Sequence, residues 1–188
     1  MLNVNAQKPE SVTFNIQSVD RIAAKNTVRA TFTFTPSAGG AGPSSVTLNY
    51  PAGFFATSAT PTATSSTSGA ILTPAQPGAT SIVLAASGTS LAAGIAVTIT
   101  LSGCTIGVAR AATDSITVQT NTDPTASSPA VSSGVIGGAV TTVSFNIAPG
   151  DRVAGKTGVQ ATFAFTPSAG LGFVSNSWFE GVLPPPVR

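Results

Sequence analysis

Apolar and polar residues alternate over short stretches along this chain, as they do in β-strands with one buried face. The alternation runs through residues 12–16, 30–35, 45–50, 97–102 and 115–119, and residues 81–85 (SIVLA) are a further candidate. A period of two places successive side chains on opposite faces of a sheet, so the apolar set is expected to face a core. Clusters of Gly, Pro, Ser and Asn separate the stretches, as turn residues do. The pattern therefore predicts an all-β protein.

The number and spacing of these strands indicate the class of all-β fold. Several short strands without a convincing amphipathic helix favour an immunoglobulin-like β-sandwich. Residues 91–94 (LAAG) allow one helical turn at most, because Gly94 and the Thr-rich flanks end it. Residues 57–69 have low complexity and predict a long exposed loop.

An internal repeat organises the chain. Residues 12–39 and 143–170 are identical at 18 of 28 positions, without a gap, at an offset of 131. This similarity predicts a tandem repeat with a period of about 131 residues, of which the second copy is incomplete. The predicted parts are a full sandwich module, a linker or module-end strand, the first strands of a second module, and a tail outside the repeat. In that order they span residues 1–130, 131–142, 143–170 and 171–188.

Charge is scarce, which changes how the surface is solvated. Only 7% of residues are charged, and none lies between Arg29 and Arg110. The 22 serines and 27 threonines must therefore solvate much of the surface, either as free hydroxyls or as O-glycosylation sites at 57–69 and 122–133. The net charge of +2 includes no Lys/Arg cluster, so nucleic acid is not an expected partner. No apolar stretch reaches the roughly 20 residues of a membrane span.

The residues that usually carry catalysis are missing or isolated. The chain has no histidine, no G-x-S-x-G and no Gly-rich phosphate-binding motif, so we expect no enzyme, no cofactor and no metal centre. The single cysteine, Cys104, follows a predicted strand and is expected to be a small buried hydrophobe rather than a reactive thiol.

One charged group recurs in the repeat. Asp20, Arg21 and Lys25 lie between the first two predicted strands, and Asp151, Arg152 and Lys156 occupy the same places in the second copy. The group fits a turn held by a local ion pair, an inter-module or inter-subunit contact, or calcium binding through Asp20 with Asp123.

The second copy also leaves two apolar strands without a visible partner. These strands carry Phe145, Ile147, Phe163 and Phe165. A two-stranded hairpin is marginal in water, and an apolar edge invites pairing. We therefore expect these residues to take part in strand exchange with a neighbour.

Three segments resemble bacterial-type extracellular immunoglobulin-like repeats, which occur in adhesins, cell-wall fibrils and S-layer-like proteins. They are residues 45–53 (SVTLNYPAG), 91–103 (LAAGIAVTITLSG) and 114–123 (DSITVQTNTD). The resemblance covers residues 11–123. It implies an extracellular or cell-surface structural or adhesive role with self-association, and it carries over no site residues.

A carbohydrate-binding module of a larger secreted protein is the alternative. Sugar-binding sandwiches stack exposed aromatic rings on the sugar, and Tyr50, Phe54 and Phe55 lie near one predicted loop.

Overall fold

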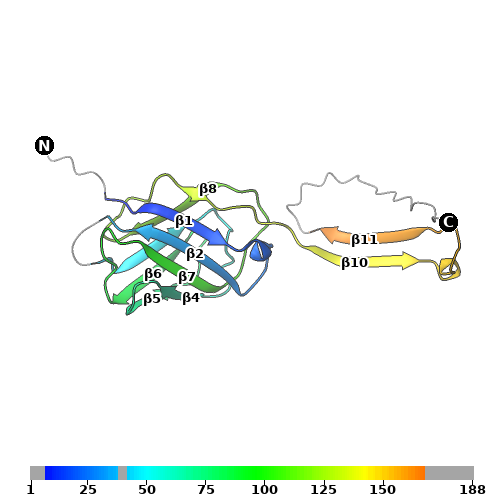
Figure 1. Ribbon diagram of the computed structural model, residues 1–188, viewed down its shortest axis with the longest axis horizontal. Coiled ribbons are helices and arrows are strands. Elements are labelled where there is room, and N and C mark those ends of the chain that lie inside the picture. The colour runs from blue at the N-terminus through cyan, green and yellow to red at the C-terminus, as the bar shows by residue number, and fades with distance from the viewer. Residues whose placement is uncertain (1–6, 38–41, 168–188) are drawn as a thin grey trace.

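The computed structural model describes residues 7–37 and 42–167, and the regular elements in this part of the chain are strands and two short 3-10 turns. Figure 1 shows β1 to β9 gathered in a two-sheet body, with β10 and β11 as a hairpin set apart from it. The strands of the body are β1 (Glu10–Ile16), β2 (Val28–Thr35), β3 (Ser45–Asn49), β4 (Thr62–Ser65), β5 (Ala70–Pro74), β6 (Ser81–Gly88), β7 (Val97–Cys104), β8 (Asp114–Thr120) and β9 (Val131–Ser132). None of the helical segments in the described ranges is long and apolar enough to cross a membrane.

The first sheet of the body has the strand order β1-β2-β7-β4, and all its neighbours are antiparallel. In β2 and β7 the apolar residues alternate mostly with Thr and Ser, and with Arg29 at the start of β2. Each strand therefore buries one face and exposes the other to solvent. Phe32 opposes Ile99 on the buried face. On the wet face Thr33 opposes Thr98, and their hydroxyl oxygens are 2.9 Å apart.

The second sheet has the order β5-β6-β3-β8-β9, with β3 near its centre. Leu48 of β3 opposes Ile82 of β6 on one side and Val118 of β8 on the other. All three side chains are fully buried. The alternation in the sequence therefore sets which face of this sheet points inward, as it does in the first sheet.

One hydrophobic core draws its residues from both sheets. Its largest fully buried side chains are Phe32, Phe34, Phe54, Phe55, Ile16, Leu48, Ile82, Leu84, Leu91, Ile99, Leu101 and Ile106. Cys104 is also fully buried, which confirms its predicted place as a small core residue. Two antiparallel sheets on a shared core are consistent with a β-sandwich, and the all-β prediction is confirmed.

The separate hairpin pairs β10 (Val140–Ile147) with β11 (Ala161–Pro167). Its register repeats that of β1 and β2 at the offset of 131, so Phe14 opposes Phe32 and Phe145 opposes Phe163. Each pair has a register shift at the same place, beside Ser11 with a φ of 52° and Thr142 with a φ of 53°. The two copies of the repeated sequence therefore form the same local structure.

Short 3-10 turns follow β1 and β10 at equivalent positions, η1 (Ser18–Asp20) and η2 (Pro149–Asp151). They begin the connections to β2 and β11. Both are only three residues long, so the chain reverses direction without an α-helix.

Two elements differ from the sequence prediction. Residues 57–69 were expected to form one exposed loop, but they contain β4, which pairs with β7 at the edge of the first sheet. The β4 sequence Thr-Ala-Thr-Ser contains no large apolar residue, so it carries no strand signal of its own. Its place in the sheet is visible only from its pairing with β7. β5 was likewise missed, and residues 91–94 form no helix.

The boundary between body and hairpin falls within residues 131–142, which were expected to be a linker or a module-end strand. β9 pairs with β8, so residues 131 and 132 form a strand of the body. β10 begins at Val140, three residues before the predicted start of the second copy at 143. The predicted tail, residues 171–188, lies outside the described residues.

Candidate functional site: the repeated loop and the exposed hairpin

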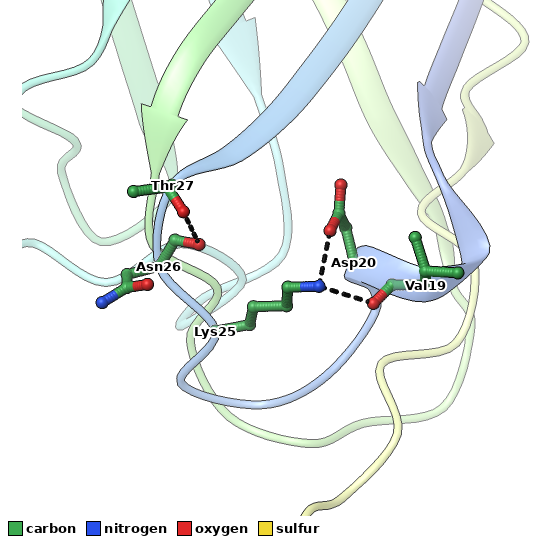
Figure 2. A network of polar contacts seen from close by, with 5 residues as sticks. All are labelled: Val19, Asp20, Lys25, Asn26 and Thr27. Atoms are coloured by element: carbon green, nitrogen blue, oxygen red, sulfur yellow. Dashed lines mark hydrogen bonds and ion pairs between the residues drawn. The ribbon is translucent and has the colours of Figure 1, made fainter.

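The connection between β1 and β2 carries the recurring charged group. Lys25 Nζ lies 2.7 Å from Asp20 Oδ1 and donates a hydrogen bond of 2.8 Å to the Val19 carbonyl, as Figure 2 shows. The two charged side chains are 37% and 21% exposed. An ion pair this close to solvent contributes at most about 1 kcal/mol. These two residues therefore form a turn with a local ion pair.

Arg21, between them in the sequence, points elsewhere. Its Nε donates to the Ile16 carbonyl at 2.9 Å, and its Nη1 donates to the Ser133 carbonyl at 2.7 Å. Partial burial lowers the pKa of the guanidinium from its usual value, but arginine remains charged. The Arg21 side chain therefore joins the end of β1 to Ser133, which lies 112 positions after Arg21 in the chain.

The segment that Arg21 reaches, residues 133–137, is the exit segment of the body and leads to β10. Ala23 N–H donates to the Gly137 carbonyl at 2.9 Å, and Gly137 N–H donates back to the loop at 2.9 Å. The exit segment also pairs with Arg110 through backbone hydrogen bonds of 2.9 and 3.0 Å. The loop thus fixes the chain at Gly137, three residues before the hairpin begins at Val140.

The second copy of the loop has the same internal bonds. Lys156 Nζ lies 2.6 Å from Asp151 Oδ1 and donates to the Gly150 carbonyl at 2.9 Å. Arg152 Nε donates to the Ile147 carbonyl at 2.9 Å, as Arg21 Nε does to Ile16. Arg152 is exposed, however, whereas Arg21 is half-buried. The loop conformation therefore follows from its own sequence and does not depend on the body.

The hairpin shows an apolar face to solvent. Phe145, Phe163 and Phe165 are 62%, 63% and 50% exposed, and Ile147 is half-buried. The three rings lie next to one another, with centroids 6.3 Å apart for Phe145 and Phe163 and 6.1 Å apart for Phe163 and Phe165. Contiguous exposed apolar surface of this kind is a candidate for an interaction site. The structure thus brings together the residues predicted for strand exchange.

The aromatic platform expected for sugar binding is not present at Tyr50, Phe54 and Phe55. Their exposed fractions are 3%, 0% and 1%, and each ring packs on the other two with centroids 4.9 to 6.3 Å apart. Burial raises the pKa of the Tyr50 hydroxyl above its usual value, with a smaller contribution from Cys104. These rings are core residues, so they do not offer the exposed stacking surface that the carbohydrate-binding alternative requires.

Asp20 and Asp123 do not form the calcium site that was one of the alternatives. Asp123 is fully buried and accepts hydrogen bonds from the Ser37 N–H at 3.0 Å and the Ser37 hydroxyl at 2.6 Å. Asp20 is paired with Lys25. Within residues 7–37 and 42–167 no three His, Cys, Asp or Glu side chains come together as a metal site would require.

The hydroxyl-rich segments divide into exposed and structural parts. Residues 57–60 are exposed, as expected for modification sites, but Ser127 and Ser133 are buried. The Ser127 hydroxyl accepts a hydrogen bond from the Val118 N–H at 3.0 Å. Sequence reasoning missed this role, because alternation along a strand does not show which loop hydroxyl will cap it.

Comparison of the chain with protein-family models, with curated proteins and with solved structures found no significant match.

Proposed function

We propose that this chain is a structural or adhesive part of an extracellular, tandem-repeat surface protein, with immunoglobulin-like modules that act as spacers or self-associating units. The observation that carries the proposal is the hairpin β10–β11. It repeats the register, the 3-10 turn and the ion pair of β1–β2 at an offset of 131 residues. A sequence that builds the same unit twice is suited to an extended array.

The chemistry of the surface supports the same role. The ion pairs lie in loops, and hydroxyl side chains cover the wet face of the first sheet. The one free thiol is Cys104, whose pKa burial raises to about 12, so it is not a nucleophile at neutral pH. No residue of the described chain stands out as a catalytic group, and we propose that the protein performs no reaction.

Negative-stain electron microscopy of the native protein, with its mass determined in parallel, tests the proposal. We expect filaments or ordered sheets. Compact monomers of the sequence mass in microscopy, together with a monomeric mass in solution up to about 1 mM, would contradict self-assembly and direct the search to soluble ligands, beginning with glycans.

A further inference from the structure

The hairpin β10–β11 has two chemically different faces. Its apolar face carries Val143, Phe145 and Phe163, and its other face carries polar side chains such as Asn146 and Thr162. The charged residues of the hairpin lie in the connecting loop. The apolar face is therefore uncharged, and a second identical face could lie against it without bringing like charges together.

The size of this face sets the strength of such a contact. A phenylalanine side chain buries 150–250 Å². Three rings that are 50% to 63% exposed therefore offer about 350 Å² per hairpin. Two copies would bury about 700 Å² from the rings alone, and the exposed Val140 and Val143 add to this. The total buried area approaches the roughly 1,000 Å² of a small specific interface, so we expect a weak but specific dimer.

The body of another copy is a poorer partner for this face. Its equivalent position is filled by β1 and β2, whose apolar residues are covered there, with Phe32 and Phe34 at 0% exposure. If β10–β11 displaced them, the freed β1–β2 hairpin would expose the same kind of face. Replacing one hairpin with the other would therefore bury no additional apolar surface, whereas the pairing of two free hairpins would bury the apolar faces of both.

We propose that two copies of this chain associate through their β10–β11 hairpins, apolar face against apolar face, about a two-fold axis. The inference rests on the proposed self-associating function and names one of its contact surfaces. Because a two-fold contact closes at a dimer, a filament or sheet needs a second contact as well. Each hairpin supplies Phe145, Phe163 and Phe165 to a shared core between two twisted two-stranded sheets. The Asp151–Lys156 pair stays in the loop, outside this core. The polar faces with Asn146 and Thr162 remain in water.

Sedimentation equilibrium of the full chain tests the proposal. We expect a monomer–dimer equilibrium with a Kd of about 100 µM or tighter. Phe163→Asp should raise the Kd by at least about tenfold, because it places a charge in the centre of the interface. Thr162→Asp is the matched control, since it puts the same charge one residue away on the polar face, and it should leave the Kd within about twofold.

Amide resonances provide a readout that does not depend on a variant folding correctly. On dilution of the unaltered chain, the resonances of Phe145, Phe163 and Phe165 should shift, while those of the body should not. A chain that stays monomeric up to about 1 mM, or a dimer that Phe163→Asp leaves intact, would overturn the proposal.

Microscopy of the Phe163→Asp variant separates this inference from the proposed function. Loss of ordered assemblies together with the dimer supports both. If the unaltered chain shows no hairpin dimer and the variant still forms ordered assemblies, the proposed hairpin contact is wrong. The proposed structural function would then still stand.

Discussion

Phe32 and Phe163 occupy the same position of the repeated sequence, and each opposes a phenylalanine on the neighbouring strand of its hairpin, Phe14 and Phe145 respectively. Phe32 is 0% exposed, whereas Phe163 is 63% exposed. The difference arises because β7 and the second sheet cover β2, and no strand of the described chain covers β11 in the same way. The same residue in the same local structure is thus a core residue in one copy and a surface residue in the other.

This pair gives a direct prediction for stability. Phe32→Ala should lower the free energy of unfolding of the body by about 3–5 kcal/mol, because it removes a fully buried ring and leaves a cavity. Phe163→Ala should change the same free energy by less than about 0.5 kcal/mol. Urea denaturation followed by circular dichroism at low protein concentration measures both. Equal losses from the two substitutions would show that the hairpin packs on the body.

The loop between β1 and β2 holds two residues in a backbone conformation that suits glycine. Ala24 has a φ of 60° and Thr27 a φ of 57°, and the second copy has Gly155 and Gly158 in these places. A β-branched residue at positive φ is strained. Ala24→Gly and Thr27→Gly should therefore each stabilise the body by about 0.5–1 kcal/mol.

The midpoint of urea unfolding checks this prediction, with Gly158→Thr as the control. That change strains only the separate hairpin, so the midpoint for the body should not move. A body destabilised by Thr27→Gly would mean that the Thr27 hydroxyl, which donates to the Asn26 carbonyl at 2.7 Å, matters more than the backbone strain.

Gly134 in the exit segment is expected to be intolerant of a side chain. Its φ is 68°, and a Cβ atom there would overlap the guanidinium of Arg21. Gly134→Ala should destabilise the body by about 2 kcal/mol, because it adds backbone strain and moves the end of the Arg21 side chain away from Ser133. The amide of Gly137 should then exchange with solvent faster.

Gly94→Ala is the matched control for Gly134→Ala. Gly94 has a similar φ of 71°, but a Cβ atom there meets nothing within 4 Å. Its substitution should cost only the backbone strain, about 1 kcal/mol, and should leave the exchange rate at Gly137 unchanged. If the two variants lose equal stability, the contact with Arg21 contributes nothing.

Cys104 predicts how stability depends on pH. Burial raises the pKa of its thiol from 9.0 to about 12, so between these values the unfolded chain loses this proton while the folded chain keeps it. The folded state then binds more protons, and stability falls as pH rises through this window, by at most about 1.4 kcal/mol per pH unit. Urea midpoints at pH 8 and pH 10 measure the fall. The Cys104→Ala variant should be less stable at pH 8, and its stability should fall less steeply between pH 8 and pH 10. If the fall is as steep as in the unaltered chain, the pH dependence of stability comes from Tyr50 and other groups.

Several features of the candidate site were accessible from the sequence because they depend on nearby residues. The ion pair of the turn joins Asp20 and Lys25, which are only five positions apart, and its recurrence at Asp151 and Lys156 follows from the repeat. The destination of Arg21 was not accessible, because Ser133 lies 112 residues away and its carbonyl has no sequence signal. The role of Tyr50, Phe54 and Phe55 was also undecided by sequence, since three aromatic residues near a loop can face a core or a ligand.

The sequence by itself determined the strands with strong alternation, the repeat and the local form of both hairpins, because strand alternation and turn geometry are set within a few residues. The tertiary structure decided which hairpin is covered, where β4 pairs and which aromatic residues enter the core. These outcomes depend on contacts between segments far apart in the chain, and the burial of a side chain is a property of its neighbours in space. Phe32 and Phe163 share one sequence context and differ only in what lies over them.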